Sequence, residues 1–237
     1  MAHGLPLWLL LRNFIFPPTC FACGTLTDSH RELLCPVCER SVRRVTFADP
    51  LLVLASGRLC GDGLCAGLLA HYHFVAGGPV QDLLHALKYG GLTGVGRVLG
   101  ERVGMDALGQ SWIGDVDMIV PMPLFRTRQR ERGYNQSESI ARGIAMVIRK
   151  PVRPHILRRA RPTVSQTTLG YAARQLNVRD AFTVPPRKRS SLAGKRVLLV
   201  DDVVTTGATT RACAICLRQE GATAVYVAAA ALAEQVP

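Results

Sequence analysis

The sequence is poor in aromatic and in acidic residues, and it has no hydrophobic run long enough to cross a bilayer. Phe, Trp and Tyr make up 6% of the 237 residues, so stacking surfaces for nucleobases are scarce. The apolar segment Leu5–Phe16 is interrupted by Pro6 and Arg12 and is too short for a transmembrane helix. It also lacks the basic flank of a signal peptide. We therefore expect a cytoplasmic protein without a transmembrane segment.

The scarcity of acids is greatest in one part of the chain. There are 29 Lys and Arg against 17 Asp and Glu, a formal net charge of +12, and 18 of the basic but three of the acidic residues lie between Val120 and Arg196. All of the positive excess therefore lies in this segment. Such a field attracts polyanions, meaning pyrophosphate, nucleotides or nucleic acid. A solvated basic face that serves solubility is the alternative.

Hydrophobic periodicity predicts one α/β domain with a small appendage. At 237 residues and 48% hydrophobic, the chain can bury a core, and it shows no internal repeat. The expected order of strands and helices implies a parallel sheet flanked by helices, with a site at the carboxyl ends of the strands. The expected strands are 68–75 at an edge, 117–124, 197–200 and 223–232, and the expected helices are 80–89, 94–108, 136–148 and 208–220.

The most informative stretch is Lys195–Thr210. Val197–Val200 is typical of a central parallel strand, and Asp201 and Asp202 follow where that strand is expected to end. Thr205-Thr206-Gly207 is a short loop before a helix, and a helix opening of this kind binds a phosphate through backbone N–H groups and hydroxyls. The acidic pair can accept hydrogen bonds from a ribose diol or help to hold Mg²⁺ through its waters. Together they describe a ribose 5-phosphate site.

Two other known phosphate motifs do not fit this stretch. It lacks the Gly-Lys-Ser/Thr ending of an ATP-binding loop and the spaced glycines of a dinucleotide fingerprint. In the segment that follows, the apolar positions Ala208, Ala212, Ile215 and Cys216 have helical spacing and predict a helix. Cys213 is expected to pack as a small apolar side chain.

Basic side chains are candidates for a second anion contact. Arg126, Arg128, Arg130 and Arg132 fall at alternate positions, so they form one ridge if the segment is extended and spread around an axis if it is helical. Lys88 and Tyr89 precede Gly90-Gly91, a helix end that is also typical of ligand mouths.

Two polar stretches and a histidine pair lie outside the expected helices and the proposed phosphate motif or on the edge strand. Arg158–Asn177 is expected to be a long loop and a candidate lid, and Pro185–Arg196 a basic turn. His71 and His73 are expected at the surface.

The cysteines predict a small metal module at the amino terminus. Cys20 and Cys23 form one C-x-x-C knuckle and Cys35 and Cys38 another, so four thiolates can converge on a structural Zn²⁺. Two disulfides are the alternative, and the expected compartment favours zinc. Cys60 and Cys65 cannot complete a second site and have no assigned role. We expect residues 1–60 to carry this module and residues 61–237 to form the main domain.

The stretch around the acidic pair closely resembles the phosphoribosyl-pyrophosphate (PRPP) loop of type I phosphoribosyltransferases. With Leu87–Gly90, Pro121–Leu124, Arg132–Gln136 and the paired cysteines, the chain resembles the ComF family over about residues 17 to 232. This family is similar to type I phosphoribosyltransferases preceded by a zinc finger. Its members are implicated in handling single-stranded DNA during natural transformation.

The resemblance implies a role for each matching position. Asp201 and Asp202 would be catalytic and would meet the ribose hydroxyls and the Mg²⁺ sphere. Basic residues would face pyrophosphate, and a flexible catalytic loop would follow Arg158. The implied phosphate-binding residues are Val203, Val204, Thr205, Thr206, Gly207, Ala208 and Thr209; the implied basic residues are Lys88, Arg126, Arg128 and Arg132; the implied loop residues are Thr163, Gln166, Arg174 and Asn177.

Two functions follow from this resemblance. One is a phosphoribosyltransferase that uses PRPP and Mg²⁺, binds single-stranded DNA and acts with competence helicases or DNA-processing proteins in DNA uptake. The other is a non-catalytic nucleic-acid-binding module whose PRPP site is regulatory or inherited. Tyr134 and Tyr171 are the candidates for base stacking. No residue names the acceptor substrate.

Overall fold

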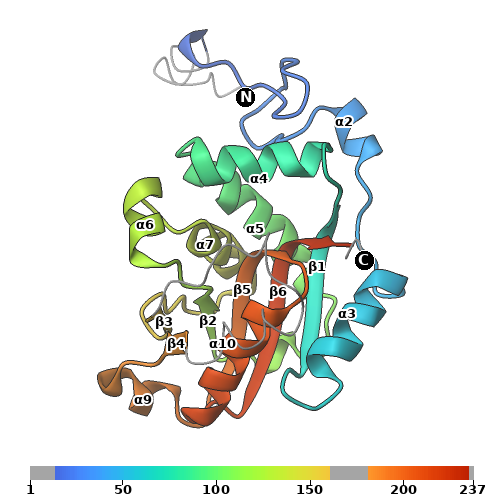
Figure 1. Cartoon of the computed structure of the whole chain (residues 1–237). Helices are drawn as coiled ribbons and strands as arrows, with labels where there is room; N and C mark the ends of the chain where they lie inside the picture. The colour runs from blue at the N-terminus through green and yellow to red at the C-terminus, as the bar shows by residue number, and fades with distance from the viewer. Residues whose placement is uncertain (1–13, 161–180, 235–237) are drawn as a thin grey trace, which may run out of the picture.

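The computed structural model describes residues 14–160 and 181–234. A four-stranded parallel sheet in the order β1-β6-β5-β2 forms its centre, with helices on both faces (Figure 1). A two-stranded antiparallel ribbon, β3 with β4, lies outside this sheet. The α/β architecture with a parallel sheet is therefore confirmed.

The four expected helices and the strands expected at 68–75 and 223–232 agree with the structure within one residue at each end. The strand expected at 117–124 ends three residues earlier, and the one expected at 197–200 ends four residues later. The strands are β1 (Gly67–Phe74), β2 (Met118–Pro121), β3 (Arg158–Arg159), β4 (Phe182–Thr183), β5 (Arg196–Val204) and β6 (Ala224–Ala233). The helices are α2 (Pro36–Ser41), α3 (Pro50–Cys60), α4 (Pro79–Tyr89), α5 (Thr93–Ala107), the 3-10 turn η1 (Ile113–Asp115), α6 (Arg126–Arg132), α7 (Gln136–Ile148), α9 (Pro186–Leu192) and α10 (Ala208–Gln219).

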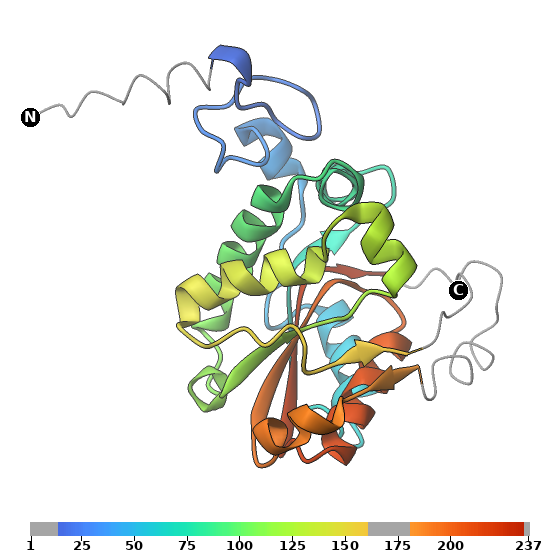
Figure 2. The same ribbon diagram turned by 90° about the vertical axis from the view of Figure 1, so that its left-hand side faces the viewer.

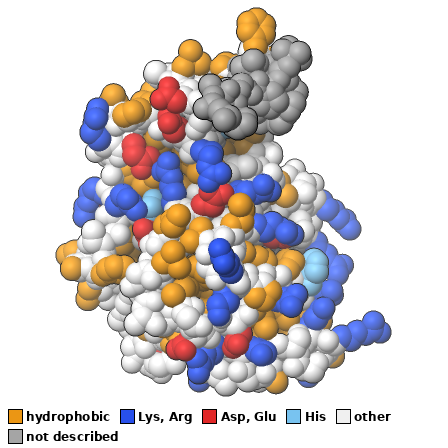
Figure 3. Space-filling model, turned by 180° about the vertical axis from the view of Figure 1, so that it is seen from behind, with side chains coloured by type: hydrophobic (Ala, Val, Ile, Leu, Met, Phe, Trp, Pro, Cys, Tyr) orange, Lys and Arg blue, Asp and Glu red, His pale blue; other side chains and the backbone are white. Residues whose placement is uncertain are grey.

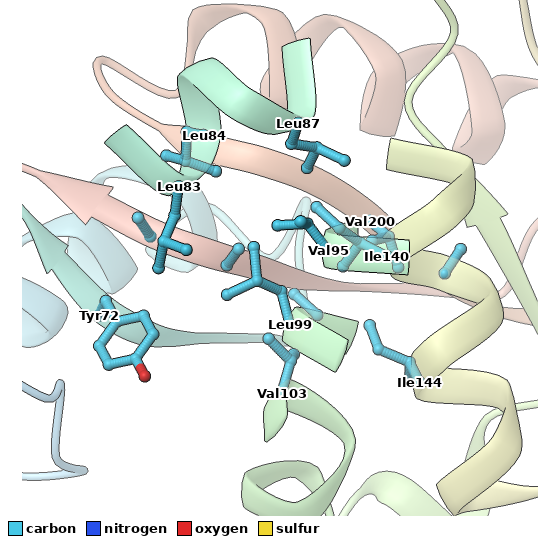
Figure 4. Packing of buried hydrophobic residues seen from close by; sticks show 14 of the residues in the cluster. Tyr72, Leu83, Leu84, Leu87, Val95, Leu99, Val103, Ile140, Ile144 and Val200 are labelled. Carbon is cyan, nitrogen blue, oxygen red and sulfur yellow. The ribbon is translucent and has the colours of Figure 1, made fainter. Parts of the chain in front are cut away.

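The alternation of side chains along β5 divides the core into two layers. Leu198 and Val200 face one layer, which they share with apolar residues of α4, α5 and α7 (Figure 4). Val197 and Leu199 face the other layer, which contains residues of α3 and α10. All four side chains have no exposed surface, as expected for a central parallel strand.

Glycines let α5 and α7 approach closely. A Cβ on Gly100 of α5 would lie 2.0 Å from the carbonyl oxygen of Ile140, and one on Gly143 of α7 would lie 2.1 Å from that of Arg97. The glycines weaken α5 as an isolated helix, but they remove the side chains that would hold the two backbones apart. This packing fixes the start of α7 relative to the sheet, and that start borders the site described below.

The amino-terminal segment lies at one end of the molecule, beyond α4 (Figures 1 and 2). It joins the sheet through residues 43–45, where the Val45 N–H donates to His71 O and the His73 N–H donates to Arg43 O. Through Leu52 and Leu59, α3 then packs in the core layer that contains Val197 and Leu199. Residues 43–60 therefore contact the main domain directly, and the division of the chain at residue 60 stays a prediction.

Three local predictions are wrong. His71 and His73 are buried, at 2% and 5% exposure, because β1 is covered by residues 43–49 and by α5. Residues 186–192 form helix α9 within the expected turn. The third is the position at which β5 ends. In α10 the buried residues are Thr210, Cys213, Ala214 and Leu217, and Ala212 and Cys216 are partly buried against the same core.

Candidate functional site

The acidic pair lies within β5 and not after it. β5 continues to Val204 because β6 keeps pairing with it, with Asp201 opposite Ala229 and Val203 opposite Ala231. The neighbour on the other side, β2, ends at Pro121 opposite Val200. The two carboxylates therefore lie just past the carboxyl end of β2, where the sheet edge opens.

Each carboxylate has a different partner. Lys88 at the end of α4 lies 2.6 Å from Asp202 Oδ2, and Ser137 Oγ donates to Asp201 Oδ1 at 3.3 Å. Burial and the adjacent charge of Asp202 raise the pKa of Asp201 well above its usual value. Burial also opposes ionisation of Asp202, but Lys88, Asp201 and the N–H of Val203 together outweigh it, and the pKa of Asp202 is lowered. The pKa values of the two carboxyl groups are therefore shifted in opposite directions.

The loop after β5 has the geometry of an anion cradle. Gly207 caps α10 with φ +74°, and the Ala208 N–H donates to Thr206 Oγ1 at 3.4 Å. A Cβ on Gly207 would lie 2.7 Å from Leu59 Cδ2, so the position needs glycine for both its backbone and its space. α10 starts directly behind this loop, with the positive end of its dipole towards it.

The acids, the loop and the basic groups meet in one cavity of about 250 Å³. Its walls come from the end of α4, the segment after β2, α6, the start of α7, β3, and the loop before α10. Of the predicted residues, Lys88, Arg128, Arg132, Asp201, Asp202, Val203, Thr205, Thr206, Gly207, Ala208 and Thr209 line it. Val204 is buried, and it lines a neighbouring cavity of about 350 Å³ that shares Thr205–Gly207 and lies against α3.

The arginine series is helical, so only part of it faces the cavity. Residues 126–132 form α6, which places Arg128 and Arg132 on the wall. Arg126 and Arg130 are exposed and are not among the wall residues. The single extended ridge is therefore replaced by two pairs that face different ways.

Seven wall residues were not predicted as site residues: Met122, Pro123, Leu124, Gln136, Ser137, Arg159 and Thr210. Gln136 and Ser137 open α7, whose first turn is tied to the end of β2 because Asn135 Nδ2 donates to Met122 O at 2.9 Å. Arg159 lies on β3, and burial lowers its pKa. The capping signal of Asn135 marked the start of α7, but nothing in the sequence placed that start beside Asp201. Thr163, Gln166, Arg174 and Asn177 lie outside the described residues.

The donors in this cavity fit Mg²⁺. Carboxylate oxygens of Asp201 and Asp202 and the hydroxyl of Ser137 are hard ligands of the kind that Mg²⁺ binds directly or through water. The phosphate groups of a bound ligand would supply further oxygens. The acidic pair is therefore suited to a metal that arrives with its ligand.

A separate four-cysteine cluster lies in the amino-terminal segment. The thiols of Cys20, Cys23, Cys35 and Cys38 all lie within 4.8 Å of one another, and Cys23 and Cys35 are 3.7 Å apart. Zn–S bonds of about 2.3 Å in a tetrahedron require about 3.8 Å between sulfurs. Hydrogen bonds from Thr25 lower the pKa of Cys23 to about 6, which favours the thiolate. The cluster fits a structural metal, while Cys60 and Cys65 form a separate hydrogen-bonded pair.

The cluster is connected to the main domain through Glu39, the residue after Cys38. Tyr72 Oη donates to Glu39 Oε1 at 2.7 Å, and Arg102 Nη1 donates to Glu39 Oε2 at 2.9 Å. Tyr72 lies on β1 and Arg102 on α5, so both partners of Glu39 belong to regular secondary structure of the main domain.

Among the described residues, no helix has the length and apolar character needed to span a membrane.

Comparison with known proteins defines the class first. Residues 116–235 match the phosphoribosyl transferase domain family. This region contains β2, α6, the acidic pair and the Thr205–Gly207 loop. The chain therefore belongs to the phosphoribosyl transferase domain family. Within this class it belongs to the ComF family, as its relatives show.

These relatives carry names from DNA uptake and use. The chain is 33% identical to "Competence protein F" of Haemophilus influenzae over 47% of this chain and 48% of that protein. It is 30% identical to "DNA utilization protein YhgH" of Escherichia coli K12 over 63% of this chain and 65% of that protein, so these matches span about half to two thirds of the relatives' length. The Salmonella typhi protein of the same name is 28% identical over 89% of this chain and 95% of its own length. A solved glutamine PRPP amidotransferase from B. subtilis matches 57% of this chain and 26% of its own, with 26% identity and a TM-score of 0.39.

Proposed function

We propose that the cavity binds PRPP with Mg²⁺ and that the chain transfers the phosphoribosyl group. The observation that carries this proposal is the convergence of Asp201, Asp202, the Thr205–Gly207 loop and four basic side chains on one cavity of about 250 Å³. The loop and α10 suit the 5-phosphate, the carboxyl groups suit the ribose hydroxyls, and the basic wall suits pyrophosphate.

The proposed reaction breaks the bond between ribose C1 and the pyrophosphate oxygen. That oxygen keeps the electron pair, and a nucleophilic acceptor forms the new bond at C1. Arg128 and Arg132 lie where they would stabilise the charge that develops on pyrophosphate. The negative charge of ionised Asp202 would stabilise the positive charge that develops on the sugar ring. Mg²⁺, when bound, would neutralise part of the pyrophosphate charge.

The proposal is tested by titrating PRPP in the presence of Mg²⁺ and by assaying pyrophosphate release. We expect Asp202→Asn to lower PRPP affinity about 30-fold or more, because it removes a charged hydrogen-bonding group from a buried site. Asp201→Asn should lower affinity less, since burial and the charge of Asp202 raise the pKa of Asp201 and so disfavour its charged form. Binding without pyrophosphate release under any acceptor would favour the regulatory or inherited site, and an absence of binding would refute the proposal.

The two arginine pairs of α6 supply a matched control. The double variant Arg128→Ala, Arg132→Ala should weaken PRPP binding by about 10-fold to 100-fold, since both side chains line the cavity. The double variant Arg126→Ala, Arg130→Ala changes net charge equally but should leave PRPP affinity within about threefold, because only a screened long-range effect is lost. Equal losses in both variants would show that the effect is the overall field and not the site.

We also propose that the chain binds single-stranded DNA and acts with helicases or other DNA-processing proteins in DNA uptake. The support is the basic segment and the printed names of the relatives. In Figure 3, Lys and Arg side chains gather along the right-hand edge. Because this view is from behind, that edge corresponds to the left-hand side of Figure 1, where α6 and α9 lie. For such electrostatic binding, the logarithm of the association constant should fall linearly with the logarithm of the salt concentration. DNA binding that survives Asp201→Asn and Asp202→Asn, with no pyrophosphate release, would favour the non-catalytic module.

Three finer proposals complete this assignment. The metal of the four-cysteine cluster is Zn²⁺, supported by the all-thiolate donor set and the sulfur spacing. The chain acts in the cytoplasm, supported by eight free cysteines, two of them exposed or half-exposed in C-x-x-C knuckles. The functional division lies near residue 60, with the metal module before it.

A further inference from the structure

An exposed aromatic side chain stands directly beside the cavity. Tyr89 is the last residue of α4, follows Lys88, and is 66% exposed. The chain turns away after it through Gly90 and Gly91, the latter with φ +68°. The ring therefore projects from a helix end that no following helical turn covers.

Tyr89 borders a second hollow that continues the cavity. This cleft has a volume of about 710 Å³ and is lined by Lys88, Tyr89, Gly90, Gly91, Arg128, Glu131 and Arg132. Three of these residues, Lys88, Arg128 and Arg132, also line the cavity with the acidic pair. Their positive charges thus lie between the two spaces, and a ligand that lies in the cleft shares them with the cavity.

The orientation of the Tyr89 ring is set by its neighbours. The His85 ring lies 4.7 Å away between centroids at an interplanar angle of 42°, and Arg132 Cζ lies 5.3 Å from the Tyr89 centroid. A stacked ligand would therefore meet a ring that is already ordered, and less side-chain entropy would be lost on binding.

Other aromatic side chains of the described residues do not offer this combination. Phe14, Phe16 and Phe47 are exposed, but none of them lines the cleft. Tyr134 is half-buried with its hydroxyl oxygen out of solvent, so its suitability for stacking is poor. Tyr171 lies outside the described residues.

We infer that Tyr89 is a stacking site for an unpaired nucleobase whose phosphate lies on Arg128 and Arg132. A planar, exposed ring next to guanidinium groups suits a ligand with an aromatic face and an anion a few bonds away. A duplex hides the faces of its bases, so the ligand is a free nucleotide or a single strand. This inference rests on the proposed binding of single-stranded DNA, and it shares Arg128 and Arg132 with the proposed PRPP site.

The test is the affinity of the metal-loaded full chain for a fluorescent ten-residue oligothymidylate, compared with a strand whose bases are replaced by abasic sites. We expect Tyr89→Ala to weaken binding of the normal strand by about 10-fold, within the range of one base stacked on one aromatic ring. Tyr89→Phe keeps the ring and should bind as the wild type does. Phe47→Ala removes an exposed aromatic far from the cleft and should change nothing.

The abasic strand separates stacking from a structural role for Tyr89. If Tyr89 stacks on a base, the wild type binds the abasic strand as weakly as Tyr89→Ala binds the normal one, and Tyr89→Ala does not distinguish the two strands. If Tyr89 only orders Arg132, the variant loses the same factor on both strands, which would overturn the inference. Equal binding of the normal strand by wild type and Tyr89→Ala would also overturn it.

Two further measurements identify the source of the base and separate this inference from the proposed function. Thymidine monophosphate that shows the same dependence on Tyr89 would identify a free nucleotide, whereas dependence seen only with the oligonucleotide would identify a single strand. The salt dependence of oligonucleotide binding should be unchanged in Tyr89→Ala and less steep in Arg128→Ala, Arg132→Ala. PRPP affinity in Tyr89→Ala should stay within about threefold, so a failure of PRPP binding in the wild type counts against the proposed function alone.

Discussion

The four-cysteine module and the cavity around Asp201 and Asp202 are built in opposite ways. All four cysteines of the module lie between residues 20 and 38, and local turns bring their thiols within 4.8 Å. The cavity takes its walls from Lys88, from residues 122–137, from Arg159 and from residues 201–210. A site of the first kind takes all its candidate ligands from one short segment, although Leu33 and Leu34 of that segment pack in the same core as α4 and α5. A site of the second kind depends on the packing of the whole domain, so the two should fail independently.

The largest expected effect comes from removing the metal. Cys35→Ser, or a chelator that competes for the metal, should remove one metal ion per chain and unfold residues 14–41, because this segment has little core of its own. Apparent binding free energies of structural zinc sites are about 10–16 kcal/mol. Metal analysis and hydrogen exchange resolved by peptide would measure both changes.

The cavity supplies the control for metal removal. PRPP affinity should stay within about threefold when the module loses its metal, since none of the cavity walls comes from residues 14–49. A chain that purifies without metal and shows no change in hydrogen exchange over residues 20–38 would instead support the disulfide alternative.

Next in size is Gly207→Ala in the phosphate loop. The substitution combines a positive φ of +74° with a Cβ 2.7 Å from Leu59, so unfolding free energy should fall by about 2–4 kcal/mol. Gly194→Ala is the matched control, because Gly194 has φ +73° and nothing within 4 Å of an added Cβ. That control should lose about 1 kcal/mol. Urea denaturation of both variants measures the difference, and equal losses would show that Leu59 yields without resistance.

A smaller effect concerns the pH dependence contributed by Asp201. Its folded pKa is raised above the usual value of 3.8, so the folded state binds a proton that the unfolded state has released. The stabilisation is complete below pH 3.8 and is lost as the pH rises towards the folded pKa. We expect Asp201→Asn to remove a decline of up to about 1.4 kcal/mol per pH unit. Unfolding free energies measured from pH 4 upwards should therefore diverge, with the variant gaining on the wild type; parallel curves would contradict the raised pKa.

The smallest effect should come from the contact between the two regions. Glu39→Gln keeps the shape of the side chain but weakens its bonds with Tyr72 and Arg102, so unfolding free energy should fall by about 1 kcal/mol. Arg31→Met removes an exposed partner of Glu101 and should change stability by less than about 0.5 kcal/mol. Thermal unfolding of both variants compares them. A loss of PRPP affinity in Glu39→Gln would show that the two regions are coupled, contrary to the comparison above.

Much of the fold could be predicted because periodicity is strong in the central elements. The starts of α7 and α10 were correct within a residue, since Asn135 and Gly207 are capping signals that act locally. The end of β5 was wrong because β6 extends the pairing past two aspartates that would not continue an isolated strand. The burial of His71 and His73 was not predicted for a similar reason, because their partners are distant in sequence. His71 is hydrogen-bonded to Asp106 at 2.5 Å and His73 to Asp49 at 2.6 Å.

The sequence by itself determined the sites whose parts are neighbours along the chain. The cysteine spacing predicted the four-cysteine cluster, and the run from Val197 to Thr210 predicted a strand, the acidic pair and the loop before α10, although not the end of that strand. Only the tertiary structure decided that Lys88 contacts Asp202, that Ser137 contacts Asp201, and that Arg128 and Arg132 face the cavity while Arg126 and Arg130 do not. The physical reason is range: capping, turn geometry and side-chain period act over a few residues, whereas these contacts depend on how β2, α4, α6 and α7 pack around one sheet edge.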